Sequence, residues 1–326
     1  MRFIARRLGF YIVAAWAAIT MNFFIPRLMP GNPVELLIAR LQGRITPQGV
    51  HAIAVAYGLE TKASLLSQYG AYWVHLFQGN FGLSITYYPT PVTSVIATAL
   101  PWTLVLVGLS TIIAFVIGTL LGVLAAWRRG SWLETAVPAT TFFQAVPYFW
   151  IGLLAITVFG VALGWFPSSG GYAQGMTISL SGAFIGSAVY HAVLPAFTIV
   201  VTSMAGWLIG MRNMMVTTLG EDYVLTAQAK GLAERRVMLT YAARNAILPN
   251  IASFALALSF VVSGSILVEV VFSYPGIGYV LFQAVENEDY PLMEGIFLII
   301  TLAVLLANLL ADMLYIVLDP RTRQEG

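Results

Sequence analysis

The polar side chains that could bind a partner or take part in a reaction are concentrated in one segment, from Asp222 to Pro249. This segment reads DYVLTAQAKGLAERRVMLTYAARNAILP and lies between two long apolar runs, in a chain of which only 9% is charged. Its guanidinium and ammonium groups suit contacts with carboxylates and phosphates. We therefore interpret the segment as a contact surface for solvent, lipid phosphate or a partner protein.

The sequence contains no set of residues with the spacing of a known catalytic or metal site. It has no cysteine, and its three histidines, His51, His75 and His191, lie far apart. It contains no GxxxxGKS/T phosphate loop, no HExxH pair and no GxSxG nucleophile elbow. These absences argue against an intramembrane enzyme, and we expect no cofactor or metal in this chain.

The composition indicates a membrane protein with helical spans. Hydrophobic residues make up 59% of the chain, and apolar runs of about the length that crosses a bilayer recur along it. These runs do not alternate as barrel strands do, so the prediction is an all-α polytopic membrane protein. Six spans are expected, at about 8–29, 102–127, 136–164, 189–211, 250–273 and 292–318. The first is expected to be retained, because its apolar run is longer than that of a signal peptide.

The basic residues orient these spans. With both termini in the cytoplasm, 12 of the 16 Lys and Arg residues fall on the cytoplasmic side, as the positive-inside rule requires. This orientation places an extracytoplasmic loop at 30–101 and a cytoplasmic loop at 212–249, within a single transmembrane domain, 1–326. The net charge of +2 is too small to predict nucleic-acid binding.

The extracytoplasmic loop is long enough to have structure of its own. Apolar and aromatic residues recur in it at helical spacing, namely Leu65, Tyr69, Tyr72, Trp73, Leu76 and Phe77. This spacing predicts an amphipathic helix on the outer surface. Such a helix could serve gating or docking, or it could cap the bundle and rest on lipid headgroups.

Within 222–249 the pattern predicts two short helices, separated by a turn and parallel to the membrane. Asp222 is the expected N-cap of the first helix, and Gly231 is the expected bend. Ala227 and Ala229 belong to a small, partly apolar face. The polar groups that could meet a partner are Lys230, Glu234, Arg235 and Arg236. The alternative is a juxtamembrane amphipathic linker.

Polar residues inside spans are candidates for a translocation pathway, because they are costly to bury in lipid. Asn308 and Asp312 share a face of the sixth span and could line an aqueous cavity, or Asp312 could pair with a cytoplasmic arginine. Glu269, in the fifth span, could contact a substrate amine, seal an outer gate or lie in water at headgroup level. An outer acidic patch, which could dock a protein or be solvated, is expected from Glu286, Glu288, Asp289 and Glu294.

Several short sequences occur in order along nearly the whole chain. The N-terminal ones are Arg6-Arg7-Leu8, PGNP at 30–33, QGNFGLS at 78–84 and LPWTL at 100–104. The later ones are HAVLPAFT at 191–198, TAQAKGLAERRV and ARNAILP within 222–249, FSYPGIGYVLFQAVENEDYP at 272–291 and LADMLYIVLDPRTR at 310–323. Together they resemble the B-type subunits of the dipeptide, oligopeptide and nickel permease family of ABC importers, whose EAA-type cytoplasmic loop corresponds to 222–249.

The residues of this loop that carry the resemblance are Ala227, Ala229, Lys230, Gly231, Leu232, Arg235, Arg236, Arg244, Asn245 and Pro249. Leu225 departs from the family pattern, because it stands where an acidic residue often opens the motif. Any role of that acid does not transfer to this chain.

The resemblance implies a transmembrane domain of the type I ABC importer class, in a prokaryotic cell membrane. Two six-helix permease subunits would form the pathway, the second being a different, C-type chain. The loop at 222–249 would insert as a coupling helix into one of two partner ATPase subunits, which would bind ATP and Mg²⁺. An extracytoplasmic binding protein would deliver the substrate.

The substrate stays open at this point. The resemblance implies short peptides, but the same importer class also carries oligosaccharides or nickel chelates. A stand-alone secondary transporter or channel is the other class of function that an all-α membrane protein suggests. We disfavour it because the sequence shows no convincing internal repeat.

Overall fold

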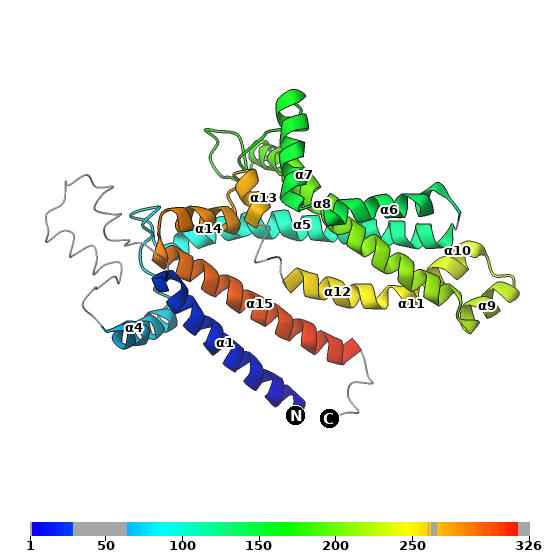
Figure 1. Cartoon of the computed structure of the whole chain (residues 1–326), viewed down its shortest axis with the longest axis horizontal. Coiled ribbons are helices and arrows are strands. Elements are labelled where there is room, and N and C mark those ends of the chain that lie inside the picture. The colour runs from blue at the N-terminus through cyan, green and yellow to red at the C-terminus, as the bar shows by residue number, and fades with distance from the viewer. Residues whose placement is uncertain (1, 29–63, 129, 260, 262–265, 319–326) are drawn as a thin grey trace. The chain divides into compact units, whose positions relative to one another are not determined.

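The computed structural model describes residues 2–28, 64–128, 130–259, 261 and 266–318 (Figure 1). Helices are the regular secondary structure of these residues, beside one isolated bridge between Leu83 and Pro91. The predicted all-α fold class is confirmed. The chain forms two compact units, one of Met1–Trp102 with Pro275–Gly326 and the other of Thr103–Tyr274.

Four helices of the described residues are long and apolar enough to cross a bilayer. They are α1 (Arg2–Leu28), α5 (Val92–Trp127), α8 (Gly182–Leu219) and α15 (Tyr290–Leu318). The expected second span began at 102, whereas α5 begins at Val92 and contains Pro101. The hydropathy of this region shows where the apolar run begins, but the helix itself begins earlier.

The third expected span, 136–164, is broken in the structure. Its parts are α6 (Trp132–Ala145), α7 (Tyr148–Ala155) and the π-helical η1 (Ile156–Ala162), and the chain bends by 91° between α6 and α7. The break falls at Val146, which is extended, and Pro147. A residue before proline is disfavoured in the helical conformation, so the helix ends there. Counted as one bent span, this pair is the fifth candidate among the described residues.

The fifth expected span, 250–273, contains two helices of the structure, α12 (Leu248–Ser259) and α13 (Ile266–Val271). Residues 260 and 262–265, between them, lie outside the described residues. Among the described residues, four or five helices are long and apolar enough to cross a membrane. The structure is therefore compatible with the six expected spans.

The expected cytoplasmic loop at 212–249 is helical over most of its length. α8 continues to Leu219, because Met211 and Met215 are fully buried against Val123 and Ala126 of α5. The following elements are α9 (Asp222–Ala229), α10 (Glu234–Arg236), the π-helical η2 (Val237–Ala243) and α11 (Arg244–Ala246), which leads into α12. Arg212 thus lies inside a long helix rather than at the start of a loop.

Two glycines bring α5 and α8 together within the second unit. A Cβ added at Gly118 would lie 2.6 Å from the Met204 oxygen, and one at Gly122 would lie 2.6 Å from the Leu208 oxygen. These distances leave no room for any side chain. The two helices therefore pack backbone to backbone, as small residues permit in membrane helices.

In the first unit, α1 packs along α15, and α14 (Ile277–Glu286) also contacts α15 (Figure 1). The predicted amphipathic helix is confirmed as α4 (Leu65–Phe77), whose N-cap Ser64 accepts a hydrogen bond from the Ser67 amide. Tyr69 contacts the rings of Phe23 and Phe24, so α4 is held against the end of α1. Residues 29–63 of the same loop lie outside the described residues.

Candidate functional site

The candidate site is the coupling segment, which we define as residues 222–246. Its first helix, α9, begins one residue earlier than predicted: the N-cap is Glu221, with extended backbone, and Asp222 is the first helical residue. The prediction of Asp222 as N-cap was therefore wrong by one position. Asp222 remains in the first turn, where its negative charge interacts favourably with the helix dipole.

The C-terminal end of α9 is a Schellman motif centred on Gly231. The Gly231 amide donates to the Gln228 oxygen at 2.9 Å, and the Leu232 amide donates to the Ala227 oxygen at 3.3 Å. Gly231 has φ +70°, in the left-handed region that glycine adopts without steric cost. The predicted bend at Gly231 is thus a defined helix stop.

An apolar cluster holds α9 in place. Val224 and Ala227, one helical turn apart, are 0% and 3% exposed and pack on Val237 of η2. Side chains packed against this cluster come from the ends of α5 and α8 and from the turn and η2, namely Trp127, Leu219, Leu232 and Tyr241. The short helix therefore rests on the ends of two long membrane helices in the same unit (Figure 1).

A side-chain hydrogen bond adds a second attachment. The Asn245 amide donates to the Tyr223 hydroxyl at 3.0 Å and to the Tyr241 backbone oxygen at 3.1 Å. The first bond joins α11 to α9, and the second joins the Asn245 side chain to the preceding turn, in η2. The Leu232 contact and this bond lie at opposite ends of α9, so both ends of the helix are restrained.

The opposite face of the segment is open to solvent. The predicted contact residues Ala229, Lys230, Gly231, Glu234, Arg235 and Arg236 are all exposed. Ala227 is not part of this face, because it is buried beneath α9. The two alanines that the sequence placed on one face therefore have different positions: Ala227 anchors the helix and Ala229 faces outward.

Glu269, on α13, is fully buried and accepts a 2.7 Å hydrogen bond from the Thr103 hydroxyl of α5. This burial contradicts the expectation of a carboxylate in water at headgroup level. Both residues belong to the second unit, which begins at Thr103, within α5. The hydrogen bond therefore joins α5 to α13 inside that unit. Glu269 thus has an internal structural partner in this conformation.

Two pathway candidates lie on α15. Asn308 is half-buried. Asp312 is on the same helix, but its side chain lies outside the described residues. Their shared face follows from the helix, and a role in the pathway stays a prediction.

Of the four residues of the expected outer acidic patch, Glu286 is exposed and Glu288 is half-buried, whereas Asp289 and Glu294 point inward. Asp289 is fully buried, and its carboxylate accepts hydrogen bonds from the Ser84 hydroxyl at 2.5 Å, the Thr86 amide at 2.8 Å and the Leu292 amide at 3.2 Å. The last bond caps the N-terminus of α15. Asp289 was expected on the surface because sequence alone does not show that Ser84 lies beside it.

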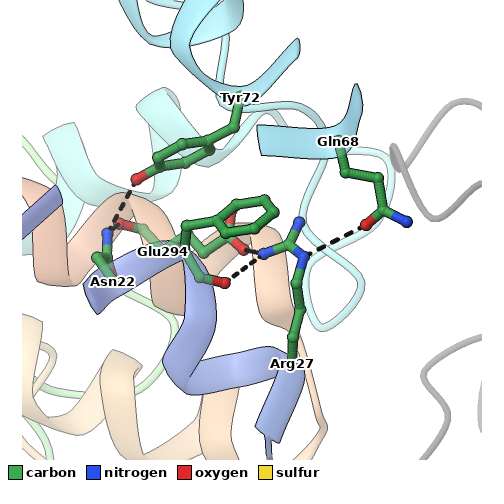
Figure 2. A network of polar contacts seen from close by, with 6 residues as sticks. Asn22, Arg27, Gln68, Tyr72 and Glu294 are labelled. Carbon is green, nitrogen blue, oxygen red and sulfur yellow. Dashed lines mark hydrogen bonds and ion pairs between the residues drawn. The ribbon is translucent and has the colours of Figure 1, made fainter. Parts of the chain in front are cut away.

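Glu294 also points inward, where it pairs with Arg27 of α1 (Figure 2). Arg27 receives further support from Gln68 of α4, whose side-chain oxygen accepts a 3.4 Å bond. Asn22 donates to the Glu294 backbone oxygen at 2.7 Å and to the Tyr72 hydroxyl at 3.2 Å. This network joins α1, α4 and α15 within the first unit, so Glu294 is a structural residue rather than part of a docking surface.

Sequence reasoning missed three residues that hold the coupling segment in place, namely Tyr223, Trp127 and Val237. Tyr223 and Val237 lie one position from residues that were named, and Trp127 ends an expected span. A search for apolar residues at helical spacing would have found Val224 and Ala227 as a buried pair. Nothing in the sequence shows that Trp127 packs against them, because that contact joins segments about 100 residues apart.

The chain matches the family model of the binding-protein-dependent transport system inner membrane component over residues 118–324. It is 36% identical, over 303 residues and 92% of each chain, to the oligopeptide transport system permease protein AppB of Bacillus subtilis (strain 168). It is also 36% identical to the di/tripeptide transport system permease protein DppB of Pseudomonas aeruginosa (strain UCBPP-PA14), with 100% of this chain and 99% of the relative covered. A putative peptide transport system permease protein of Brucella abortus (strain 2308) is 33% identical over 94% of this chain and 93% of its own length.

Proposed function

Because this chain belongs to the family of binding-protein-dependent transport system inner membrane components, we propose that its coupling segment receives the work of a partner ATPase. The chain is a multi-pass permease subunit of an ABC importer, and ATP hydrolysis occurs on partner subunits. In this proposal the exposed side of the coupling segment contacts the ATPase, with Lys230 at the end of α9 and Glu234 and Arg236 on α10.

The observation that carries this proposal is the anchoring of α9. A helix that transmits force has to be fixed to the elements that it moves. Val224 and Ala227 fix α9 to the ends of α5 and α8, and the bond between Asn245 and Tyr223 fixes it to α11. A displacement of α9 would therefore move the membrane helices as a rigid body.

The proposed assembly contains two permease subunits, of which the second is a C-type chain, two ATPase subunits with ATP and Mg²⁺, and an extracytoplasmic binding protein. The coupling segment and both termini lie in the cytoplasm, which agrees with the distribution of Lys and Arg. Short peptides are the proposed substrates, because the relatives are described as oligopeptide, di/tripeptide and peptide transport proteins.

Gly231 provides the test. Alanine at Gly231 would be forced into the left-handed region, at a cost of roughly 1–2 kcal/mol, and proline could not adopt φ +70° at all. The complex would be purified, reconstituted in liposomes, and assayed for ATP hydrolysis and for uptake of a di- or tripeptide. We expect Gly231→Ala to lower uptake per ATP hydrolysed, and Gly231→Pro to abolish uptake while hydrolysis persists.

Gly175→Ala is the matched control. Gly175 has φ +83°, and at both glycines an added Cβ would meet nothing within 4 Å. The two substitutions therefore impose the same kind of backbone strain, one in the coupling segment and the other between η1 and α8. Equal coupling in all three variants would contradict the proposal, and so would peptide transport by this chain without any ATPase.

A further inference from the structure

A groove of about 590 Å³ lies at the end of α5, in the second unit. One wall is formed by Leu124 and Trp127 of α5 and by Arg128, which follows that helix. The other wall is formed by Glu234 and Arg235 of α10 and Met238 of η2. Its volume lies within the range of small-molecule sites. Glu234 and Arg235 also belong to the exposed side of the coupling segment.

The groove carries a net positive charge. Arg128 and Arg235 contribute two guanidinium groups from segments 107 positions apart, and Glu234 contributes one carboxylate. Within the described residues, neither Arg128 nor Arg235 forms an ion pair. Two guanidinium groups on one cavity, neither in an ion pair with a described residue, suit an anion with several acceptor oxygens, as a phosphate has.

The position of the groove indicates the source of that phosphate. α5 is a membrane-crossing helix, and its last residue is Trp127. Tryptophan is enriched at the ends of such helices, where they meet the membrane interface. Leu124 lies one turn deeper along α5 and, like Met238, is half-buried and apolar. The wall therefore changes from apolar to charged over one helical turn, as a phospholipid does between its acyl chains and its phosphate.

We propose that this groove binds an anionic phospholipid with a hydroxyl-bearing headgroup, such as phosphatidylglycerol. Arg128 and Arg235 donate hydrogen bonds to the phosphate oxygens, and Leu124 and Met238 contact the upper part of the acyl chains. Glu234 accepts a hydrogen bond from a headgroup hydroxyl and repels a headgroup carboxylate, so phosphatidylserine binds more weakly. Basic pockets beside membrane helices are known to take such headgroups.

The test uses the full chain purified with its partner subunits. Native mass spectrometry in detergent measures retained phosphatidylglycerol during a titration with that lipid. We expect Arg128→Ala with Arg235→Ala to weaken binding by roughly tenfold or more, since each basic residue contributes separately to anionic lipid binding. The double lysine variant keeps both charges and is expected to retain most of the binding.

Arg244→Ala is the matched control, because Arg244 is exposed in the same segment but does not line the groove. An equal loss in this control would overturn the proposal. Displacement of phosphatidylglycerol by inorganic phosphate would also overturn it, in favour of a site for free phosphate. Loss of the ATPase from the purified complex, with unchanged lipid retention, would show that the groove binds a protein instead.

Discussion

The Asn245 amide lies 3.0 Å from the Tyr223 hydroxyl and joins α11 to α9. α11 leads through Ile247 into α12, so this bond ties the exposed helix to an element that continues as an apolar helix. The pair is separated by 22 positions, and its hydrogen bond is exposed. Under the proposed function, it is one of two routes by which a motion of α9 reaches the rest of its unit.

Asn245→Ala is expected to reduce the coupling of ATP hydrolysis to peptide uptake. The substitution removes two neutral hydrogen bonds, to the Tyr223 hydroxyl and the Tyr241 backbone oxygen, and each such bond contributes about 0.5–1.5 kcal/mol. Tyr223→Phe removes only the hydroxyl and is expected to act in the same direction. Thr226→Val is the control, because among the described residues the Thr226 hydroxyl bonds only to the Asp222 oxygen, within α9. The prediction fails if the ratio of uptake to hydrolysis falls as far in Thr226→Val as in Asn245→Ala.

Ala227→Leu and Ala229→Leu are predicted to differ although both lie in the last turn of α9. Ala227 is 3% exposed in a packed cluster, so a larger side chain there costs about 1–3 kcal/mol. Ala229 is exposed, and surface substitutions change stability by less than about 0.5 kcal/mol. Thermal denaturation of the purified complex should show a lower midpoint for Ala227→Leu alone. Equal shifts would mean that α9 is not docked as the structure shows.

Thr103→Val is predicted to destabilise the second unit by about 1–3 kcal/mol, because it removes a hydrogen-bond donor from the fully buried Glu269 carboxylate. Thr111→Val is the control on the same helix, since in the part of the chain that the structure describes the Thr111 hydroxyl bonds only to the Val107 oxygen. Chemical denaturation in detergent would compare the two variants. A loss of stability in Thr111→Val as large as in Thr103→Val would contradict the structural role of the buried bond.

The burial of Tyr72 predicts that the stability of the protein decreases at alkaline pH. Burial, together with the charge of Glu294, raises the pKa of Tyr72 from 10.0 to about 12. The folded protein thus favours the neutral phenol, so this contribution to stability is complete below pH 10 and is lost as the pH rises through about 12. The free energy of unfolding of the wild type should fall over this window more steeply than that of Tyr72→Phe.

Ultraviolet absorbance of tyrosinate provides an independent reading of the same group. The difference between wild type and Tyr72→Phe should show one tyrosine that ionises well above the ordinary value of 10.0. An ordinary pKa for that difference signal, or the same pH slope of stability in both proteins, would show that Tyr72 is not buried beside Glu294.

Local features were predicted well because their causes are local. The amphipathic helix α4 followed from apolar residues at helical spacing, and the end of α9 followed from Gly231. Errors appeared where neighbours intervened. The 136–164 span was expected to be continuous, but Pro147 ends α6 with a 91° bend. α8 was expected to end near 211, but the helix continues to Leu219 because Met215 is buried against α5.

The sequence by itself determined that this is a helical membrane protein with one basic, helix-prone segment at 222–249, because hydropathy, charge and helix stops are properties of neighbouring residues. Only the tertiary structure decided which of its polar groups are buried. Asp289 and Glu294 looked like a surface patch until Ser84 and Arg27, more than 200 positions away, were seen to bind them. The same holds for Arg128 and Arg235, which share one groove only because α10 folds back on the end of α5. Burial and pairing depend on contacts between distant segments, and those contacts are made by the folded chain.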